Sequence, residues 1–229
     1  MVQFWAEVLW YSLASLRTAP ALGENENIAG RWPCDTRPIR PRGDADALLA
    51  ARSRLLQRIE ASAPARLEAV KTRYHGDFHL AQVLVHENDF VIIYFEGEPR
   101  RTIAERRHKD SPLRDVAGML RSFDYARHTA LQKTGAQQAK AYAQLEPFAA
   151  AWKKRTGEAF LRAYFEALQW DMLLRSTEGV AGLTALFELE KALYELRYEL
   201  GNRLDWVYIP LRGLLALTGE EAPWNVRSM

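Results

Sequence analysis

The sequence predicts a mainly α-helical protein that carries one small β-hairpin. Apolar residues recur at the three- and four-residue spacing of amphipathic helices through most of the second half of the chain. Two short runs, 83–85 and 90–95, are instead rich in β-branched and aromatic residues, and four polar residues separate them, which is typical of a hairpin. The helices expected after the hairpin are 112–131, 136–174 with a break near 156–157, 183–200 and 204–217.

The chain before the hairpin divides near residue 43. Residues 1–43 are expected to form a helix over 3–17 followed by an irregular, proline-rich linker. Residues 44–229 are expected to form the folded body, which begins with a helix over 44–61 capped by an aspartate.

Composition and charge exclude several classes of protein. Lys and Arg number 31 against 29 Asp and Glu, so the net charge of +2 gives no basic surface for nucleic acid. Cys34 is the single cysteine of the 229 residues, which excludes an intrachain disulfide and a cysteine-based zinc site. The apolar stretch over 1–22 contains Glu7 and no preceding Lys or Arg, so it fits neither a secretory signal nor a membrane span. We therefore expect a cytoplasmic protein without a membrane or nucleic-acid partner.

One loop before the hairpin carries candidate chemistry, and it reads His75-Gly76-Asp77-Phe78-His79-Leu80-Ala81-Gln82. Phosphoryl transfer to a hydroxyl group needs a carboxylate that accepts or orients the proton, and oxygen ligands that hold magnesium against the nucleotide phosphates. Asp77 and Gln82 have the spacing of the aspartate and the metal-binding amide in kinase-like catalytic loops. Taken alone, Asp77 also fits a turn carboxylate, and His75 and His79 fit ordinary loop histidines.

Three segments in order, HGDFHLAQVLV, FVIIYFEGEPRR and AERRHKDSPLRDVAGMLRSFDYA, resemble the maltokinases. Maltokinases belong to the aminoglycoside-phosphotransferase branch of the protein-kinase-like superfamily and are often fused to a trehalose synthase. The similarity is dense over 71–129 and weaker over 189–211. It implies a kinase that uses ATP and Mg²⁺ to convert maltose to maltose 1-phosphate in glycogen-like glucan synthesis, with a trehalose synthase as a partner.

The resemblance also assigns roles to residues of the loop and of the helix after the hairpin. It implies that Asp77 is the catalytic base, that Gln82 holds the metal and nucleotide, and that His75 braces the loop. Arg114 and Asp115 are expected to hold the loop from that helix. By residue type alone, both also fit a solvated helix N-terminus, where the negative Asp115 is favourable.

Two features depart from the maltokinase pattern. Tyr94 stands where maltokinases have an aspartate, and a neutral phenol is a poor magnesium ligand. Strand alternation places Glu96 on the same face as Tyr94, which makes Glu96 the candidate replacement ligand. The segment before the loop shows neither a glycine-rich phosphate loop nor a strand-borne lysine. We therefore expect the C-terminal lobe of a kinase-like fold whose N-terminal nucleotide lobe is missing, as in a fragment.

The helix expected over 183–200 has two distinct faces. Leucines occupy a sector of about 80°, at 100° per residue, which we expect to face the core. These leucines are Leu186, Leu189, Leu193, Leu196 and Leu200. Phe187, Lys191, Tyr194 and Tyr198 occupy a sector of about 60° nearly opposite.

The second face is a candidate sugar platform. Tyr194 and Tyr198 lie one turn apart, with Lys191 beside them, and aromatic rings with polar groups suit a disaccharide. Trp206 is the candidate wall of this site. Packing of the same stripe on a neighbouring helix is the alternative.

Two functions stay open at this point. A maltokinase-type phosphotransferase lobe explains the ordered motifs. An inactive remnant that binds maltose, or docks onto a trehalose synthase, accounts better for Tyr94 and for the missing lobe. Consumption of ATP in the presence of maltose and magnesium distinguishes the two.

Overall fold

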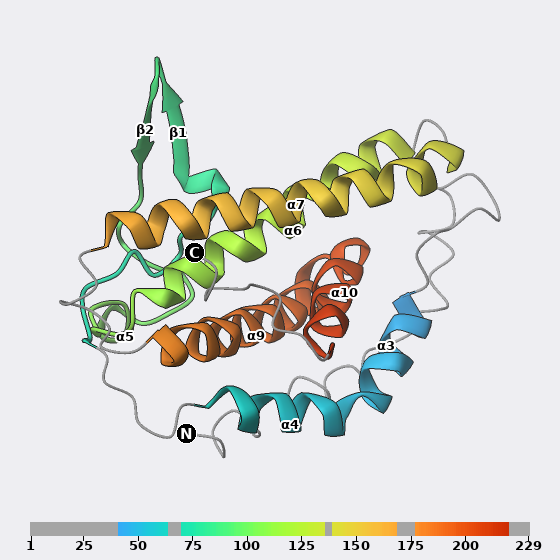
Figure 1. The fold of residues 1–229 in the computed structure, drawn as a ribbon, viewed down its shortest axis with the longest axis horizontal. Helices are drawn as coiled ribbons and strands as arrows, with labels where there is room; N and C mark the ends of the chain where they lie inside the picture. Colours follow the sequence, from blue (N-terminus) through green and yellow to red (C-terminus); the bar gives the residue numbers. More distant parts are fainter. Residues whose placement is uncertain (1–40, 64–69, 136–138, 169–176, 220–229) are drawn as a thin grey trace.

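The computed structural model describes residues 41–63, 70–135, 139–168 and 177–219, and it shows a mainly helical body with one antiparallel hairpin (Figure 1). The expected helix over 3–17 and most of the linker after it lie outside the described residues. The elements are α3 (Pro41–Ala50), α4 (Arg52–Ser62), the 3-10 turn η1 (Leu80–Gln82), β1 (Val83–His86), β2 (Asp89–Ile92), α5 (Ile103–Arg106), α6 (Leu113–Gly135), α7 (Ala139–Ala167), α9 (Thr177–Asn202), the 3-10 turn η2 (Leu204–Trp206) and α10 (Tyr208–Leu217).

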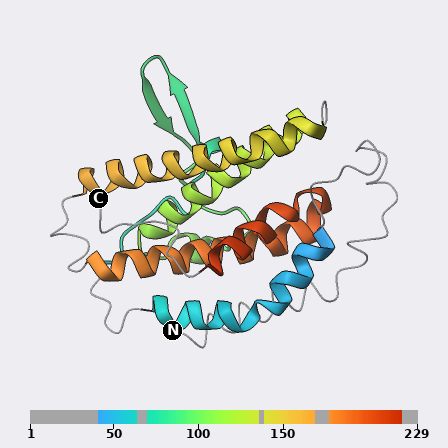
Figure 2. The ribbon, with the colours of Figure 1, turned by 45° about the vertical axis from the view of Figure 1, so that its right-hand side comes forward.

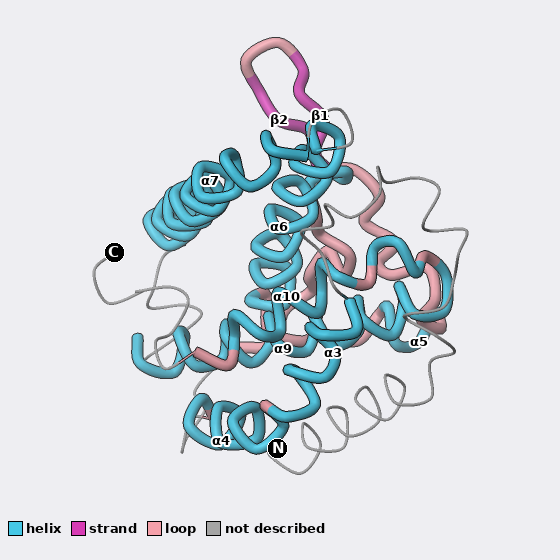
Figure 3. The backbone as a smooth tube through the Cα atoms, turned by 90° about the vertical axis from the view of Figure 1, so that its right-hand side faces the viewer, coloured by secondary structure: helices cyan, strands magenta, loops and turns pink. Residues whose placement is uncertain are grey.

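The body is built around α6. This helix packs along α7 on one side and along α9 on the other, while α10 contacts both α9 and α3 (Figures 1 and 2). The view along the helices shows α7, α6, α9 and α4 following one another across the molecule (Figure 3). Burying each large apolar side chain in such a core contributes about 1.5–3 kcal/mol relative to exposure. None of the described helices is both long enough and apolar enough to cross a membrane.

The leucine face of α9 lies in the core, as the sequence predicts. Leu186, Leu189, Leu193 and Leu196 are at most 2% exposed, and Leu200 packs against the same cluster while partly buried. This burial fixes the rotation of α9 about its axis, so the opposite stripe points away from the core towards α6 and the loop before the hairpin.

Several helix boundaries differ from those that the sequence predicts, and α9 in particular begins at Thr177 rather than at 183. The helix expected over 44–61 is two helices, α3 and α4, which meet at the buried Ala51. That bend leaves Leu48 and Leu55 both fully buried. α7 continues through the break expected near 156–157, because one interior glycine costs only about 1 kcal/mol and the contact with α6 outweighs it. The helix expected over 204–217 begins as η2 and continues as α10.

The hairpin forms where expected and stands away from the helices (Figures 1 and 3). Val83 pairs with Ile92 and His86 with Asp89. β2 therefore ends at Ile92, earlier than the run over 90–95 suggests. The chain leaves the sheet because Tyr94 adopts a left-handed backbone with φ of 60°.

Candidate active site

The loop over 75–82, called the HGD loop below, is held by the first turn of α6. The Asp115 carboxylate accepts hydrogen bonds from the backbone N–H of His75 at 2.6 Å and of Gly76 at 2.9 Å. Gly76 has φ of 85°, a left-handed conformation that favours glycine. Burial raises the pKa of Asp115, and the two N–H donors only partly oppose that effect. Asp115 thus fixes the loop backbone immediately before Asp77.

His75 fixes the other side of the loop and does not point into a cavity with Asp77. Its Nδ1 accepts a hydrogen bond from the Asp77 N–H at 3.3 Å, so Nε2 carries the proton that it donates to the Ile93 carbonyl at 2.8 Å. The ring is buried between Phe78 and Phe95, with centroid distances of 5.6 and 4.9 Å. His75 therefore joins the HGD loop to the segment after β2.

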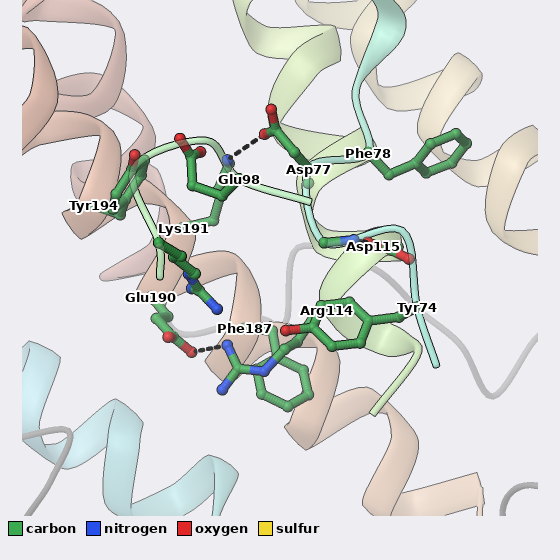
Figure 4. Close-up of a pocket in the computed structure, with 13 residues that line it drawn as sticks. Tyr74, Asp77, Phe78, Glu98, Arg114, Asp115, Phe187, Glu190, Lys191 and Tyr194 are labelled. Atoms are coloured by element: carbon green, nitrogen blue, oxygen red, sulfur yellow. Dashed lines mark hydrogen bonds and ion pairs between the residues drawn. The ribbon is translucent and has the colours of Figure 1, made fainter. Parts of the chain in front are cut away.

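Asp77 projects from the loop towards α9 (Figure 4). Its carboxylate lies 3.6 Å from Lys191 Nζ and 3.6 Å from His79 Nε2, with 15% of the side chain exposed. Burial is the largest single influence on the pKa of Asp77 and raises it. The hydrogen bond from His79 and the positive charge of Lys191 together outweigh burial, so the net shift is downward. The Asp77 carboxyl group is therefore ionised at neutral pH.

Two cavities meet at Asp77. The smaller one, drawn in Figure 4, is lined by Tyr74, Arg101 and Glu190 among others. The larger one is a groove of about 800 Å³ between α6 and α9, and it continues from Asp77 past Tyr125. A volume of this size accommodates a small-molecule ligand.

The predicted sugar stripe of α9 lines these cavities, although one of its members, Phe187, is also buried in the core. Lys191 and Tyr194 line both cavities, Phe187 lines the smaller one and Tyr198 lines the groove. Trp206 lines neither of them. It stacks instead on Tyr125 with a centroid distance of 6.1 Å, and it supports the groove from behind.

Arg114 contacts α9 and not the HGD loop, which differs from the expectation. Its Nε donates to Asp110 at 2.6 Å and its Nη1 donates to Glu190 at 2.7 Å. The guanidinium also lies 4.4 Å from the centre of the Phe187 ring. The Arg114 guanidinium thus pairs with two carboxylates, those of Asp110 and of Glu190 on α9. Of Arg114 and Asp115, only Asp115 contacts the HGD loop.

The residues expected to hold a metal do not form a site for one. Strand alternation fails to bring Tyr94 and Glu96 together, because β2 has ended at Ile92 and both side chains are exposed. The described part of the chain contains no group of three or more His, Cys, Asp or Glu that could hold a metal ion. The amide of Gln82 has no aspartate at position 94 to accompany it, and magnesium sites normally include a carboxylate. These residues therefore do not fit Mg²⁺.

Sequence reasoning missed a set of buried charges beneath the groove. Arg121 is 1% exposed and donates to Glu195 at 2.9 Å and to Asp124 at 2.7 Å. Glu195 and Glu199 both line the groove, and they follow Lys191 at intervals of four residues. The four-residue spacing of Lys191, Glu195 and Glu199 could have predicted a polar face on α9. The ion-pair partner of Glu195, Arg121, is distant in sequence and could not have been predicted in this way.

Comparisons with known proteins point to sugar kinases. No protein-family profile matches the chain. It is 34% identical over 148 residues to a glucosamine kinase of Mycolicibacterium smegmatis, and 27% identical over 150 residues to a glucosamine kinase of Streptacidiphilus jiangxiensis. Each match covers 64% of this chain, but only 34% and 31% of the respective relatives. The chain thus spans about a third of the length of these curated relatives.

Solved structures show the same likeness in the fold. A glucosamine kinase in complex with glucosamine, ADP and inorganic phosphate superimposes with a TM-score of 0.51 at 22% identity, over 94% of this chain and 44% of that chain. A second crystal form of glucosamine kinase gives a TM-score of 0.51 at 21% identity, over 96% and 44%. The fold is therefore similar to part of these glucosamine kinase structures. These relatives do not support maltokinase in particular.

Proposed function

We propose that this chain is the half of a sugar kinase that binds the acceptor sugar and carries the catalytic base. The observation that carries the proposal is the position of Asp77, an ionised carboxylate held at the junction of two cavities. The sequence similarity to glucosamine kinases and the shared fold support the same reaction class.

In the proposed reaction a sugar hydroxyl attacks the terminal phosphorus of a nucleoside triphosphate. An O–P bond forms at the sugar, the bond to the nucleoside diphosphate breaks, and the hydroxyl proton passes to the Asp77 carboxylate. Lys191, 3.6 Å away, keeps that carboxylate ionised and ready to accept the proton. Asp115 holds the backbone of His75 and Gly76, and His75 accepts the Asp77 N–H, so these contacts position the Asp77 carboxylate.

The nucleotide site is proposed to need a second part of the protein. The hairpin exposes a set of large apolar side chains next to the HGD loop, and they are Leu84, Val85, Phe90, Val91 and Ile92. An exposed apolar patch of this kind marks an interaction surface. We propose that the part binding ATP, with its Mg²⁺, covers this hairpin. Among the described residues Gln82 is the remaining candidate to approach the nucleotide.

An amino sugar is the acceptor that the site favours. The Tyr194 hydroxyl is buried next to the Glu98 carboxylate, so the two groups offer a donor and an acceptor to a bound ligand. Glu98 lines both cavities beside Asp77 and forms no ion pair within the described residues. Burial and the negative charge of Glu98 raise the pKa of Tyr194 to about 12. The ammonium group of an amino sugar would pair with Glu98.

Maltose is the second candidate acceptor. The rings of Tyr194 and Tyr198 lie 6.5 Å apart and are tilted by 32°, which offers two surfaces for successive sugar rings. A trehalose synthase partner and a role in glucan synthesis belong to this candidate. An inactive sugar-binding remnant is the alternative to catalysis, and Tyr94 at the metal position favours it.

Calorimetric titration of the chain with glucosamine and with maltose tests the acceptor. We expect Tyr194→Phe to weaken binding of the sugar by about tenfold, because one hydrogen bond to a ligand is lost. Tyr142 also has a buried hydroxyl but lies outside the groove, so Tyr142→Phe is the matched control.

Glu98→Gln separates the two sugars. It should weaken binding of glucosamine and leave binding of maltose unchanged if the carboxylate holds an ammonium group. Absence of binding by either sugar would contradict the proposed function.

A further inference from the structure

The groove between α6 and α9 extends well beyond the site at Asp77. On α6 it is lined from Gly118 to Lys133, and on α9 from Lys191 to Glu199, with Arg203 just after the end of α9. At 1.5 Å per residue the two helical spans are about 22 Å and about 12 Å long. A single sugar ring next to Asp77 fills one end of such a groove and leaves the other end open.

The far end of the groove is lined by aromatic rings, by the paired charges of Glu199 and Arg203, and by Lys133. Glu199 is 1% exposed, and it accepts one hydrogen bond from the Tyr125 hydroxyl at 2.9 Å and two from Arg203 at 2.6 and 2.8 Å. Arg203 in turn lies 5.5 Å from the centre of the Tyr198 ring, and Arg100 lies 4.6 Å from it. The acids there are neutralised by neighbours, so this end offers no unpaired anion for a cationic ligand.

The two ends therefore suit different chemical groups. Near Asp77, Glu98 suits a cationic or hydrogen-bonding substituent on the reacting unit. Farther along, the Tyr125 and Tyr198 rings and the paired guanidinium of Arg203 suit an uncharged ring that carries many hydroxyl groups. An oligosaccharide consists of such hydroxyl-rich rings linked in a row.

We infer that the acceptor is an oligosaccharide, with its reacting unit at Asp77 and its next units along the α6–α9 groove. This inference rests on the proposed function, because it assumes that the reacting sugar binds beside Asp77. It goes beyond that function in naming a chain of linked sugar units, longer than the single amino sugar or the disaccharide maltose. Each further unit gains contacts with the far end of the groove, while the phosphoryl transfer at Asp77 stays the same.

Affinity as a function of sugar length tests the inference. The probes are glucosamine with its β-1,4-linked dimer and trimer, and glucose with maltose and maltotriose, each titrated into the full chain by calorimetry. We expect the dissociation constant to fall by at least about tenfold from the single unit to the trimer in one of the two series.

A large side chain at the far end should remove that gain. Ala130 is exposed and lines this end, so Ala130→Trp should return the trimer to the affinity of the single unit without changing the affinity of the single unit. Thr134 lies one turn farther along α6 and does not line the groove, so Thr134→Trp is the matched control. Thr129→Trp, at the neighbouring lining position, replaces Ala130→Trp if circular dichroism shows that the first variant is unfolded.

The outcomes separate the inference from the function on which it rests. Equal affinity for one, two and three units in both series, or a gain that survives both tryptophan variants, overturns the oligosaccharide inference and leaves the sugar-kinase proposal standing. Failure of every sugar to bind overturns both. A length-dependent gain that only the far-end tryptophans remove supports the inference.

Discussion

At the scale of single residues, Tyr94 has a side chain that does not suit its backbone. Its φ of 60° lies in the left-handed region, where bulky residues are uncommon and Asn and Asp are several-fold enriched. The side chain is 61% exposed, so little packing offsets the cost. The backbone at this position therefore suits the aspartate that the maltokinase resemblance leads one to expect there.

Tyr94→Asn should stabilise the protein. The substitution should raise the unfolding free energy by up to about 1 kcal/mol, because asparagine tolerates the left-handed region by forming local hydrogen bonds with its side chain. Tyr94→Phe keeps the same cost and serves as the control. Urea denaturation of the three proteins measures the difference, and a lower stability for the asparagine variant than for the phenylalanine variant would count against the strain.

His128 should make the protein sensitive to acid. It is 1% exposed and its Nε2 accepts a hydrogen bond from Arg127 at 2.9 Å. Burial first, and then the charge of Arg127, lower its pKa from 6.5 to about 3, so the folded protein keeps it neutral. Between these values the unfolded chain binds a proton that the folded chain does not, and stability falls as the pH falls.

The corresponding measurement compares wild type with His128→Gln by urea denaturation at pH 7.5 and pH 5.0. Wild type should lose about 2 kcal/mol more than the variant over this interval, since each pH unit below 6.5 costs about 1.4 kcal/mol. Asp124 nearby has a lowered pKa, and its contribution is lost only below its ordinary value of 3.8, so it does not enter this interval. The same loss in both proteins would show that His128 is protonated in the fold.

Some site residues could be predicted from the sequence and others could not. Asp77 could be predicted as a candidate site residue from the spacing of residues in the HGD loop. Lys191 and Tyr194 could be predicted from the helical periodicity of α9. Arg121 could not be found this way, because its partner Glu195 is 74 residues distant and a buried arginine has no local signature. Glu98 was missed because it lies in a loop without periodicity.

At the scale of elements, α9 carries the core on one face and the candidate site on the other. Periodicity gave this division correctly because burial of four leucines fixes the rotation of the helix. The length of β2 could not be predicted from the β propensity of residues 90–95. The strand ends before the left-handed backbone at Tyr94, and that conformation depends on the path of the chain from the hairpin to the helical body.

Leu193→Ala and Tyr194→Ala should therefore separate stability from binding. Leu193 is fully buried, so its truncation costs about 2–5 kcal/mol of unfolding free energy. Tyr194 is half-buried at the cavities, and its truncation should cost less stability but weaken sugar binding. Denaturation and titration of both variants provide the comparison. Equal destabilisation with unchanged sugar affinity would place Tyr194 in the core.

At the scale of the whole molecule, a helical body with one hairpin could be predicted, and the chain is similar to part of the glucosamine kinases. The identity of the sugar could not be predicted from the sequence motif, because the residues of the HGD loop are those expected for phosphoryl transfer and not those expected to contact the acceptor sugar. The acceptor depends on side chains that the fold brings together from the loop after β2 and from two helices, such as Glu98, Tyr125 and Tyr194.

The most direct test of the catalytic claim joins this chain to the remaining part of the Mycolicibacterium smegmatis glucosamine kinase and measures phosphoryl transfer from ATP to glucosamine and to maltose. The fusion with Tyr94 should transfer phosphate slowly. The same fusion with Tyr94→Asp should bind magnesium more tightly and phosphorylate the sugar faster, because a carboxylate then accompanies Gln82. Adding Asp77→Asn should abolish transfer without abolishing sugar binding. Transfer that survives Asp77→Asn would contradict the assignment of the base, and with it the proposed reaction.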